Sequence, residues 1–324
     1  MKKILVAALS ILLIFPNTSS AVENGTSALG DPNAVAVNSG WSGFLYSPRI
    51  VLTVAHVKPF FDSGQFVGTF VGYPGQPMNA GGNTVTGLKI MFAPTYTPRT
   101  GFSGGNIFSE KDDLAVIILE KSIPMTNTVK LATLEQIETW KKNKTEVKMV
   151  GYGLQNAEMR KLREDHTKPN PQINPNFIKT NFISDNEAQS ILTRGLPRGG
   201  VFNDGMYFAI NQTTGSNCDG DSGSGWFVEE GSTRYYLGAG SNAWGIPNCG
   251  KDGVWNPSGA ISSTTASITL INLIKEAEEY IKANPEQPAI IKNVAIKTIT
   301  CKNKTLKKII KATNPVCPKG YSKV

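Results

Sequence analysis

Histidine and cysteine are both scarce in this chain of 324 residues, which holds only His56, His166 and four cysteines. No two cysteines form a CxxC motif, and none stands at metal-ligand spacing from a histidine, so a structural zinc site is not expected. The chain also lacks a GxGxxG or phosphate-loop motif, the usual sequence signs of a nucleotide site.

Acidic residues are absent after Glu286, whereas residues 287–324 hold nine lysines. The net charge of +8 therefore belongs to the tail and not to the main domain, and a nucleic-acid partner is not expected for the protein. The clustered lysines suit an anionic cell-wall polymer or a membrane surface. A solvated tail that only aids solubility is the alternative.

The N-terminus has the pattern of a secretory signal peptide. Lys2 and Lys3 precede the apolar run "ILVAALSILLIF", and the small residues "SSA" follow and end at Ala21. The run is too short to span a bilayer comfortably. We expect residues 1–21 to be removed, the mature chain to begin at Val22, and the protein to be secreted.

Export permits disulfide bonds, and four cysteines allow three pairings. The simplest pairing joins residues that share a local sequence environment: Cys218 with Cys249, and Cys301 with Cys317.

Short β-rich runs separated by Gly, Asn and Pro fill most of residues 22–286, and they predict an antiparallel barrel or sandwich. The runs are "NAVAVNSG", "GFLYSPRIVLTVAH", "LKIMFAP", "DLAVIIL", "EVKMVGYG", "GMYFAIN" and "RYYLGAGSNAWG". One clear helix is expected over residues 265–285, and residues 155–200 are interpreted as long surface loops. Residues 287–324 are expected to form a linker and a small module.

A serine in a tight turn is the candidate nucleophile. Ser222 lies in "GDSG", but a serine hydroxyl needs a neighbouring base. His166 lies in a polar, proline-rich stretch, so His56 at the end of a strand is the better candidate. A carboxylate must then orient the imidazole, and Asp112 or Asp113 before the strand "LAVIIL" can supply it.

The segments "LTVAHV", "DLAVIIL" and "GDSG" resemble the histidine, aspartate and serine motifs of chymotrypsin/trypsin-like serine proteases. The resemblance implies an all-β fold of two six-stranded antiparallel barrels with a C-terminal helix. It implies His56 as base, Asp113 as the orienting acid and Ser222 as nucleophile, with an oxyanion hole at the N–H groups of Gly220 and Ser222. No cofactor or metal is implied, because such a triad needs neither.

The resemblance also implies a disulfide bond between Cys218 and Cys249, a substrate pocket and an activation pair. The pocket base falls at Ser216, and the walls fall at Trp244, Gly245 and Gly253. An uncharged pocket favours a bulky apolar or aromatic residue before the scissile bond, although Asp219 or Asp252 would reverse this preference if it pointed inward.

Two further expectations follow from the family pattern. The free ammonium of Val22 pairs with Asp221, and either Ser241 or Ala243 begins the segment that binds the substrate backbone.

The function expected from the sequence is that of a secreted, monomeric serine endopeptidase acting on proteins or peptides. The main alternative is a catalytically silent homologue that binds a partner at the cell surface. Esterase or autoproteolytic activity is a weaker possibility. The tail "ITC…CPKGY" resembles a lysine-rich, two-cysteine module at the ends of secreted bacterial proteins.

Overall fold

The computed structural model of the chain describes residues 25–38, 40–78, 83–96, 112–154, 157–165, 167, 172–182, 184, 186, 207–212, 218–244, 258–263, 268–286, 297–303, 306–312 and 316–324. Its contacts divide the chain into two compact units, Met1–Asn284 and Pro285–Val324. No helix among the described residues is both long enough and apolar enough to cross a membrane.

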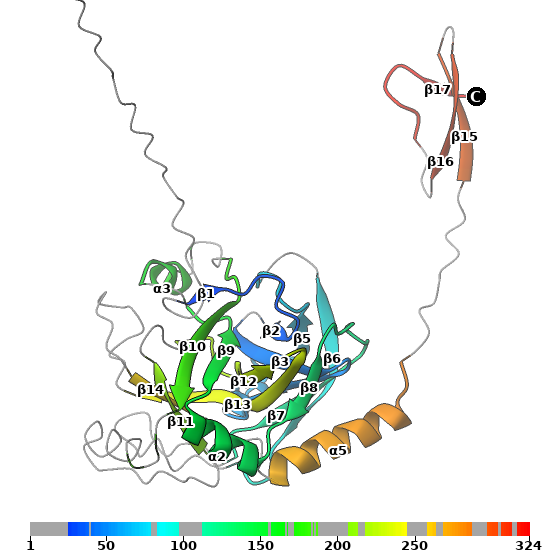
Figure 1. Ribbon diagram of the computed structural model, residues 1–324. Coiled ribbons are helices and arrows are strands. Elements are labelled where there is room, and N and C mark those ends of the chain that lie inside the picture. The colour runs from blue at the N-terminus through cyan, green and yellow to red at the C-terminus, as the bar shows by residue number, and fades with distance from the viewer. Residues whose placement is uncertain are drawn as a thin grey trace, which may run out of the picture. The chain divides into compact units, whose positions relative to one another are not determined.

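The first barrel is closed and antiparallel, with six strands paired in the ring order β2-β3-β4-β7-β6-β5 (Figure 1). Its strands are β2 (Ala34–Val37), β3 (Trp41–Ser47), β4 (Ile50–Thr53), β5 (Thr69–Gly72), β6 (Thr84–Phe92) and β7 (Ala115–Leu119). β4 and β7 are buried along their whole length, which explains their nearly continuous apolar sequences. The short helix α1 (Lys58–Asp62) follows β4.

The second barrel repeats this strand order. Its strands are β9 (Glu146–Gly151), β10 (Asn176–Phe182), β11 (Tyr207–Gln212), β12 (Gly225–Glu230), β13 (Thr233–Trp244) and β14 (Ser258–Ser263). The antiparallel pairings run β9-β10-β11-β14-β13-β12 and return to β9, so the ring closes. Two short strands join its outside: β1 (Thr26–Ser27) pairs with β10, and β8 (Thr128–Leu131) pairs in parallel with β13. The predicted double β-barrel is confirmed.

The sequence suggested that residues 155–200 are long surface loops, but the structure shows that they are not only loops. They contain α3 (Ala157–Glu164) and β10, a strand of the second barrel. β10 alternates buried and less buried positions as expected of a barrel strand, but its sequence "NFIKTNF" lies among asparagines and prolines that dominate the local composition.

Helices close two sides of this unit. α5 (Ile268–Ala283) buries Leu270, Leu273, Ile274 and Ala277, one face of a helix, in a core shared with β7. α2 (Leu134–Asn143) begins at a capping box in which the side chains of Thr133 and Gln136 bond each other's backbone N–H groups.

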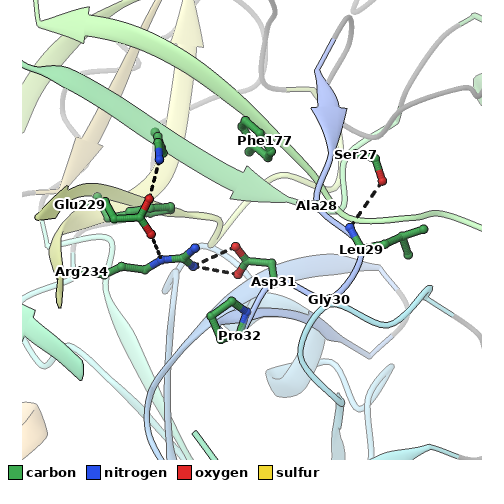
Figure 2. A pocket seen from close by; sticks show the side chains of 11 residues that line it. Ser27, Ala28, Leu29, Gly30, Asp31, Pro32, Phe177, Glu229 and Arg234 are labelled. Carbon is green, nitrogen blue, oxygen red and sulfur yellow. Dashed lines mark hydrogen bonds and ion pairs between the residues drawn. The ribbon is translucent and has the colours of Figure 1, made fainter. Parts of the chain in front are cut away.

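An ion network centred on the buried Arg234 attaches the segment before β2 to the second barrel. The guanidinium of Arg234 lies between two carboxylates, 2.8 Å from Asp31 and 3.0 Å from Glu229 (Figure 2). It also lies over the ring of Phe227, 4.4 Å from the centroid, beside a cavity of about 320 Å³. Lys148 pairs with Glu229 from the other side. The N-terminal segment is thus held by charge as well as by the short strand β1.

The C-terminal unit contains a three-stranded antiparallel sheet in the order β16-β15-β17. The strands are β15 (Lys297–Lys302), β16 (Lys307–Ala312) and β17 (Ser322–Lys323). Cys301 and Cys317, a pair expected from the sequence, form a disulfide bond. So small a sheet buries little apolar surface, and the disulfide compensates for that.

Candidate active site

The site forms where the two barrels meet. His56 follows β4, Asp113 precedes β7, and Ser222 precedes β12 of the second barrel. Because β4 and β7 are antiparallel, with Thr53 opposite Ala115, the chain leaving β4 and the chain entering β7 lie side by side. The fold therefore brings His56 and Asp113 together from positions 57 residues apart.

The side chains of the three candidate residues form a continuous hydrogen-bonded row. His56 Nδ1 lies 2.8 Å from Asp113 Oδ2, and His56 Nε2 lies 2.9 Å from Ser222 Oγ. The Asp113 side chain is fully buried, whereas the imidazole of His56 keeps 22 % of its surface exposed. The Asp113 end of the row is therefore closed to water, whereas the imidazole in the middle is partly accessible.

The Asp113 carboxylate is surrounded by donors. Oδ1 accepts hydrogen bonds from the backbone N–H groups of Ala55 and His56, at 2.8 and 2.7 Å. Oδ2 accepts from the Ser241 hydroxyl at 2.5 Å in addition to His56. Burial alone would raise the pKa of Asp113, but the charge of His56 and these hydrogen bonds hold the pKa below its usual value.

An ionised Asp113 determines the protonation of the imidazole. A carboxylate can only accept, so Nδ1 of His56 carries the proton that faces it. In the neutral ring Nε2 is then an acceptor, and the Ser222 hydroxyl donates to it. This arrangement can draw a proton from Ser222 Oγ.

The structure distinguishes Asp112 from Asp113, between which the sequence left a choice. The carboxylate of Asp112 accepts a hydrogen bond from the Thr95 hydroxyl, whereas the carboxylate of Asp113 faces His56. Ser241, at an irregularity in the β13–β14 register between Gly240 and Asn242, is the serine that reaches Asp113.

The turn that carries Ser222 depends on glycine. Gly220 and Gly223 have φ angles of +98° and +84°, which side-chain-bearing residues rarely adopt. A Cβ on Gly223 would clash with the carbonyl oxygen of Ser42 and the hydroxyl of Thr53. Among the described residues, no acceptor faces the backbone N–H of Gly220 or of Ser222. Within the described part of the chain, the two N–H groups therefore meet this requirement of the predicted oxyanion hole.

Asp221 is a residue of this turn, between Gly220 and Ser222, and it is fully buried. Its carboxylate accepts from the N–H groups of Gly153 and Cys218, at 2.7 and 2.9 Å. Burial raises the pKa of Asp221 to about 7 despite these two bonds. A buried carboxylate with this shift is suited to a cationic partner, but Val22, the predicted one, lies outside the described residues.

Most of the predicted substrate pocket also lies outside the described residues, and its role stays a prediction. This applies to Ser216, Gly245, Gly253 and Asp252, and to His166. The backbone of Trp244 ends β13, where it pairs with Gly259. Cys218 is buried, but Cys249 is outside the described residues, so their pairing stays a prediction. Within the described ranges, no group of three or more His, Cys, Asp or Glu side chains is placed to hold a metal.

Sequence reasoning missed Ser42 on β3. Its hydroxyl lies 2.8 Å from the carbonyl oxygen of Gly220 in the nucleophile turn. No motif marks the residue, and its neighbours in space are 110 and 178 positions away in the chain.

Two comparisons with known proteins address the family to which the chain belongs. No curated protein matches the chain. A model of the trypsin family matches residues 26–267, which span both barrels and include His56, Asp113 and Ser222. The matched span is most of the chain, and the chain belongs to the trypsin family of serine proteases.

Proposed function

We propose that this trypsin-family protein is a secreted serine endopeptidase in which His56, Asp113 and Ser222 form the catalytic triad. The observation that carries the proposal is the row of contacts at 2.8 and 2.9 Å from Asp113 through His56 to Ser222. It has the polarity that the reaction needs, since a buried anion faces one imidazole nitrogen and a hydroxyl faces the other.

In the first half of the reaction, Ser222 Oγ attacks the carbonyl carbon of the scissile peptide bond while His56 Nε2 takes the hydroxyl proton. The negative charge that forms on the carbonyl oxygen is stabilised by the N–H groups of Gly220 and Ser222. His56 then gives its proton to the departing amine, and Ser222 remains acylated. Asp113 stabilises the imidazolium throughout and stays ionised.

Water completes the cycle by the same route. His56 takes a proton from water, the hydroxide adds to the acyl carbon, and the bond to Ser222 Oγ breaks as Oγ regains a proton. The products are a carboxylic acid and the free enzyme.

Activation by the new N-terminus belongs to the proposal. Cleavage after Ala21 would free the ammonium of Val22 to pair with Asp221, whose buried carboxylate lies beneath the turn between Gly220 and Ser222. Secretion would then complete the oxyanion hole without a separate propeptide.

Specificity is proposed on sequence features alone, and location on the sequence and on one pair of facing lysines. The uncharged pocket base at Ser216 favours an apolar or aromatic residue before the scissile bond, and the enzyme acts as a monomer. The lysine-rich C-terminal unit binds an anionic cell-surface polymer or membrane. Lys302 and Lys307 stand directly opposite each other on β15 and β16, a repulsive pair that an anionic partner would relieve.

A peptide library tests the central proposal. The protein beginning at Val22 and its Ser222→Ala variant are incubated with the library, and the cut sites are identified by mass spectrometry. We expect cleavage after apolar or aromatic residues by the first protein and none by the variant. Cuts dominated by Lys and Arg would contradict the specificity, and no Ser222-dependent cleavage would favour a silent binding homologue.

A further inference from the structure

A buried hydroxyl of the first barrel reaches the turn that carries the nucleophile in the second. Ser42 lies on β3 and is fully buried. Its Oγ is 2.8 Å from the carbonyl oxygen of Gly220 and 2.8 Å from the backbone nitrogen of Tyr152. The hydroxyl thus connects three segments that are distant in sequence.

The directions of these two hydrogen bonds follow from the chemistry of the groups. The N–H of Tyr152 can only donate, so Ser42 Oγ accepts there. The carbonyl of Gly220 can only accept, so it receives the hydroxyl proton of Ser42. The row from Tyr152 to Ser42 to Gly220 therefore runs in one direction, and each bond polarises the next.

The backbone of Ser42 makes a second contact with the same turn. Its N–H donates to the carbonyl oxygen of Ser222 at 2.9 Å, and its own carbonyl accepts from the Thr53 hydroxyl at 2.9 Å. Ser42 therefore touches both residues whose N–H groups form the proposed oxyanion hole.

Gly220 is a position where such a restraint matters. Its φ of +98° is one that residues with a Cβ rarely adopt. A glycine backbone also rotates easily unless neighbouring groups restrain it. The peptide before its Cα carries the proposed oxyanion donor, and the carbonyl of that peptide, from Asp219, accepts from the N–H of Leu154 at 2.9 Å. The peptide after its Cα is held at its carbonyl by Ser42 and at its N–H, that of Asp221, by the Cys218 carbonyl oxygen at 2.9 Å.

The bonds from Leu154 and from Ser42 come from different barrels. Leu154 follows β9 of the second barrel, whereas Ser42 belongs to the first barrel, which also carries His56 and Asp113. A hydrogen bond from Ser42 to Gly220 therefore aligns the oxyanion donor with the barrel that carries the base. We propose that Ser42 is a positioning residue that orients Gly220 in the oxyanion hole, an inference that rests on the endopeptidase function proposed above.

Ser42→Ala removes the hydroxyl and leaves the rest of the side chain. We expect kcat for a peptide amide chosen from the library to fall at least about tenfold, less than the 10²–10³-fold typical of removing a donor outright. KM should change less than about twofold, because the hydroxyl acts on the transition state and not on the bound substrate.

A pair of inhibitors separates positioning from a general structural effect. A peptide aldehyde of the same sequence adds to Ser222 Oγ and places an oxygen in the oxyanion hole, whereas the corresponding peptide alcohol does not. In Ser42→Ala the aldehyde should bind about tenfold more weakly and the alcohol should bind as in the unmodified protein.

Thr53→Val is the matched control. It removes another buried hydroxyl that bonds Ser42, keeps the side-chain shape, and leaves the bond from Ser42 to Gly220 in place. Its kcat should stay within about twofold of the unmodified protein even if its stability falls as much as that of Ser42→Ala. Equal losses of kcat in the two variants would overturn the inference.

Crystal structures of the unmodified protein and both variants test the positioning without relying on activity. The Gly220 carbonyl should turn away from its position in Ser42→Ala and keep it in Thr53→Val. An unmoved Gly220 in Ser42→Ala would overturn the inference, even in an active enzyme. If the unmodified protein cleaves nothing but Gly220 moves as expected, the endopeptidase proposal fails while the positioning by Ser42 stands.

Discussion

The hydroxyl of Ser241 donates a hydrogen bond of 2.5 Å to Oδ2 of Asp113, the same oxygen that faces His56. It is one of the contacts that hold the pKa of Asp113 below its usual value. In Ser241→Ala the pKa of Asp113 should rise, and the free energy of unfolding at pH 7 should fall by about 1.5–3 kcal/mol.

The loss in Ser241→Ala should depend on pH. The pKa of Asp113 is lowered on folding, so its contribution to stability is present above the unfolded pKa and is lost as pH falls through the folded pKa. The deficit of the variant, measured by urea unfolding, should therefore shrink in acid. The exposed Ser232→Ala is the control, and an equal loss there would contradict the account.

Gly223→Ala should abolish activity and destabilise the fold. The residue has φ +84°, and a Cβ would clash with the Ser42 carbonyl and the Thr53 hydroxyl, both on rigid strands. Gly231 also has a positive φ of +60°, but a Cβ there meets nothing within 4 Å. Gly231→Ala should cost only about 1–2 kcal/mol and leave activity intact. Thermal unfolding and peptide cleavage distinguish the two, and comparable losses would refute the steric argument.

The charge of Asp221 should make stability depend on pH in a chain that retains residues before Val22. Burial raises the pKa of Asp221 from 3.8 to about 7, so the native state binds a proton that the unfolded state has lost between these values. The free energy of unfolding should therefore fall by roughly 4 kcal/mol as pH rises from about 4 to about 7.

Two comparisons isolate this effect. In the chain beginning at Val22, the ammonium should pair with Asp221 if the proposed activation is right, and the fall between pH 4 and 7 should then be largely absent. Asp221→Asn in the longer chain should also remove it, because the amide does not titrate. Urea unfolding over this pH range provides the measurement, and identical curves for the two chain lengths would exclude the proposed pairing.

Arg234→Ala should cost about 3 kcal/mol or more of stability, because it leaves the nearly buried carboxylate of Asp31 without its cation. Lys58→Ala breaks an ion pair with Asp62 in which both side chains are largely exposed, and should cost less than about 1 kcal/mol. Denaturant unfolding of both variants tests the contrast. A loss below 1 kcal/mol in Arg234→Ala would mean that the network in Figure 2 contributes little.

Much of the fold could be predicted because the signals of the first barrel are local. The runs that contain β4 and β7 are apolar, short and bounded by turns, and α5 repeats its buried residues at helical spacing. β10 could not be identified in the same way, because its place in the barrel comes from pairing with β9 and β11 and not from its own composition. The helix α3 was not predicted either, because its sequence is mostly polar and was interpreted as a surface loop.

The residues of the candidate site likewise fall into two groups, those marked by a local sequence pattern and those known only from tertiary contacts. His56, Asp113 and Ser222 stand in short segments with their own sequence patterns, so they could be named in advance. The contact of Ser241 with Asp113 depends on an irregular register in β13, and Ser42 touches neighbours that only the packing of two barrels brings near. Contacts of that kind leave no spacing in the sequence.

Covalent labelling tests the central claim most directly. A fluorophosphonate phosphonylates an activated serine: Oγ bonds to phosphorus, fluoride leaves, and the base takes the hydroxyl proton. The protein beginning at Val22 should therefore gain one adduct, located at Ser222 by peptide mass mapping. His56→Ala should remove nearly all labelling, because the hydroxyl then lacks its base. Labelling at another residue, or at an equal rate in His56→Ala, would contradict a catalytic row from Asp113 through His56 to Ser222.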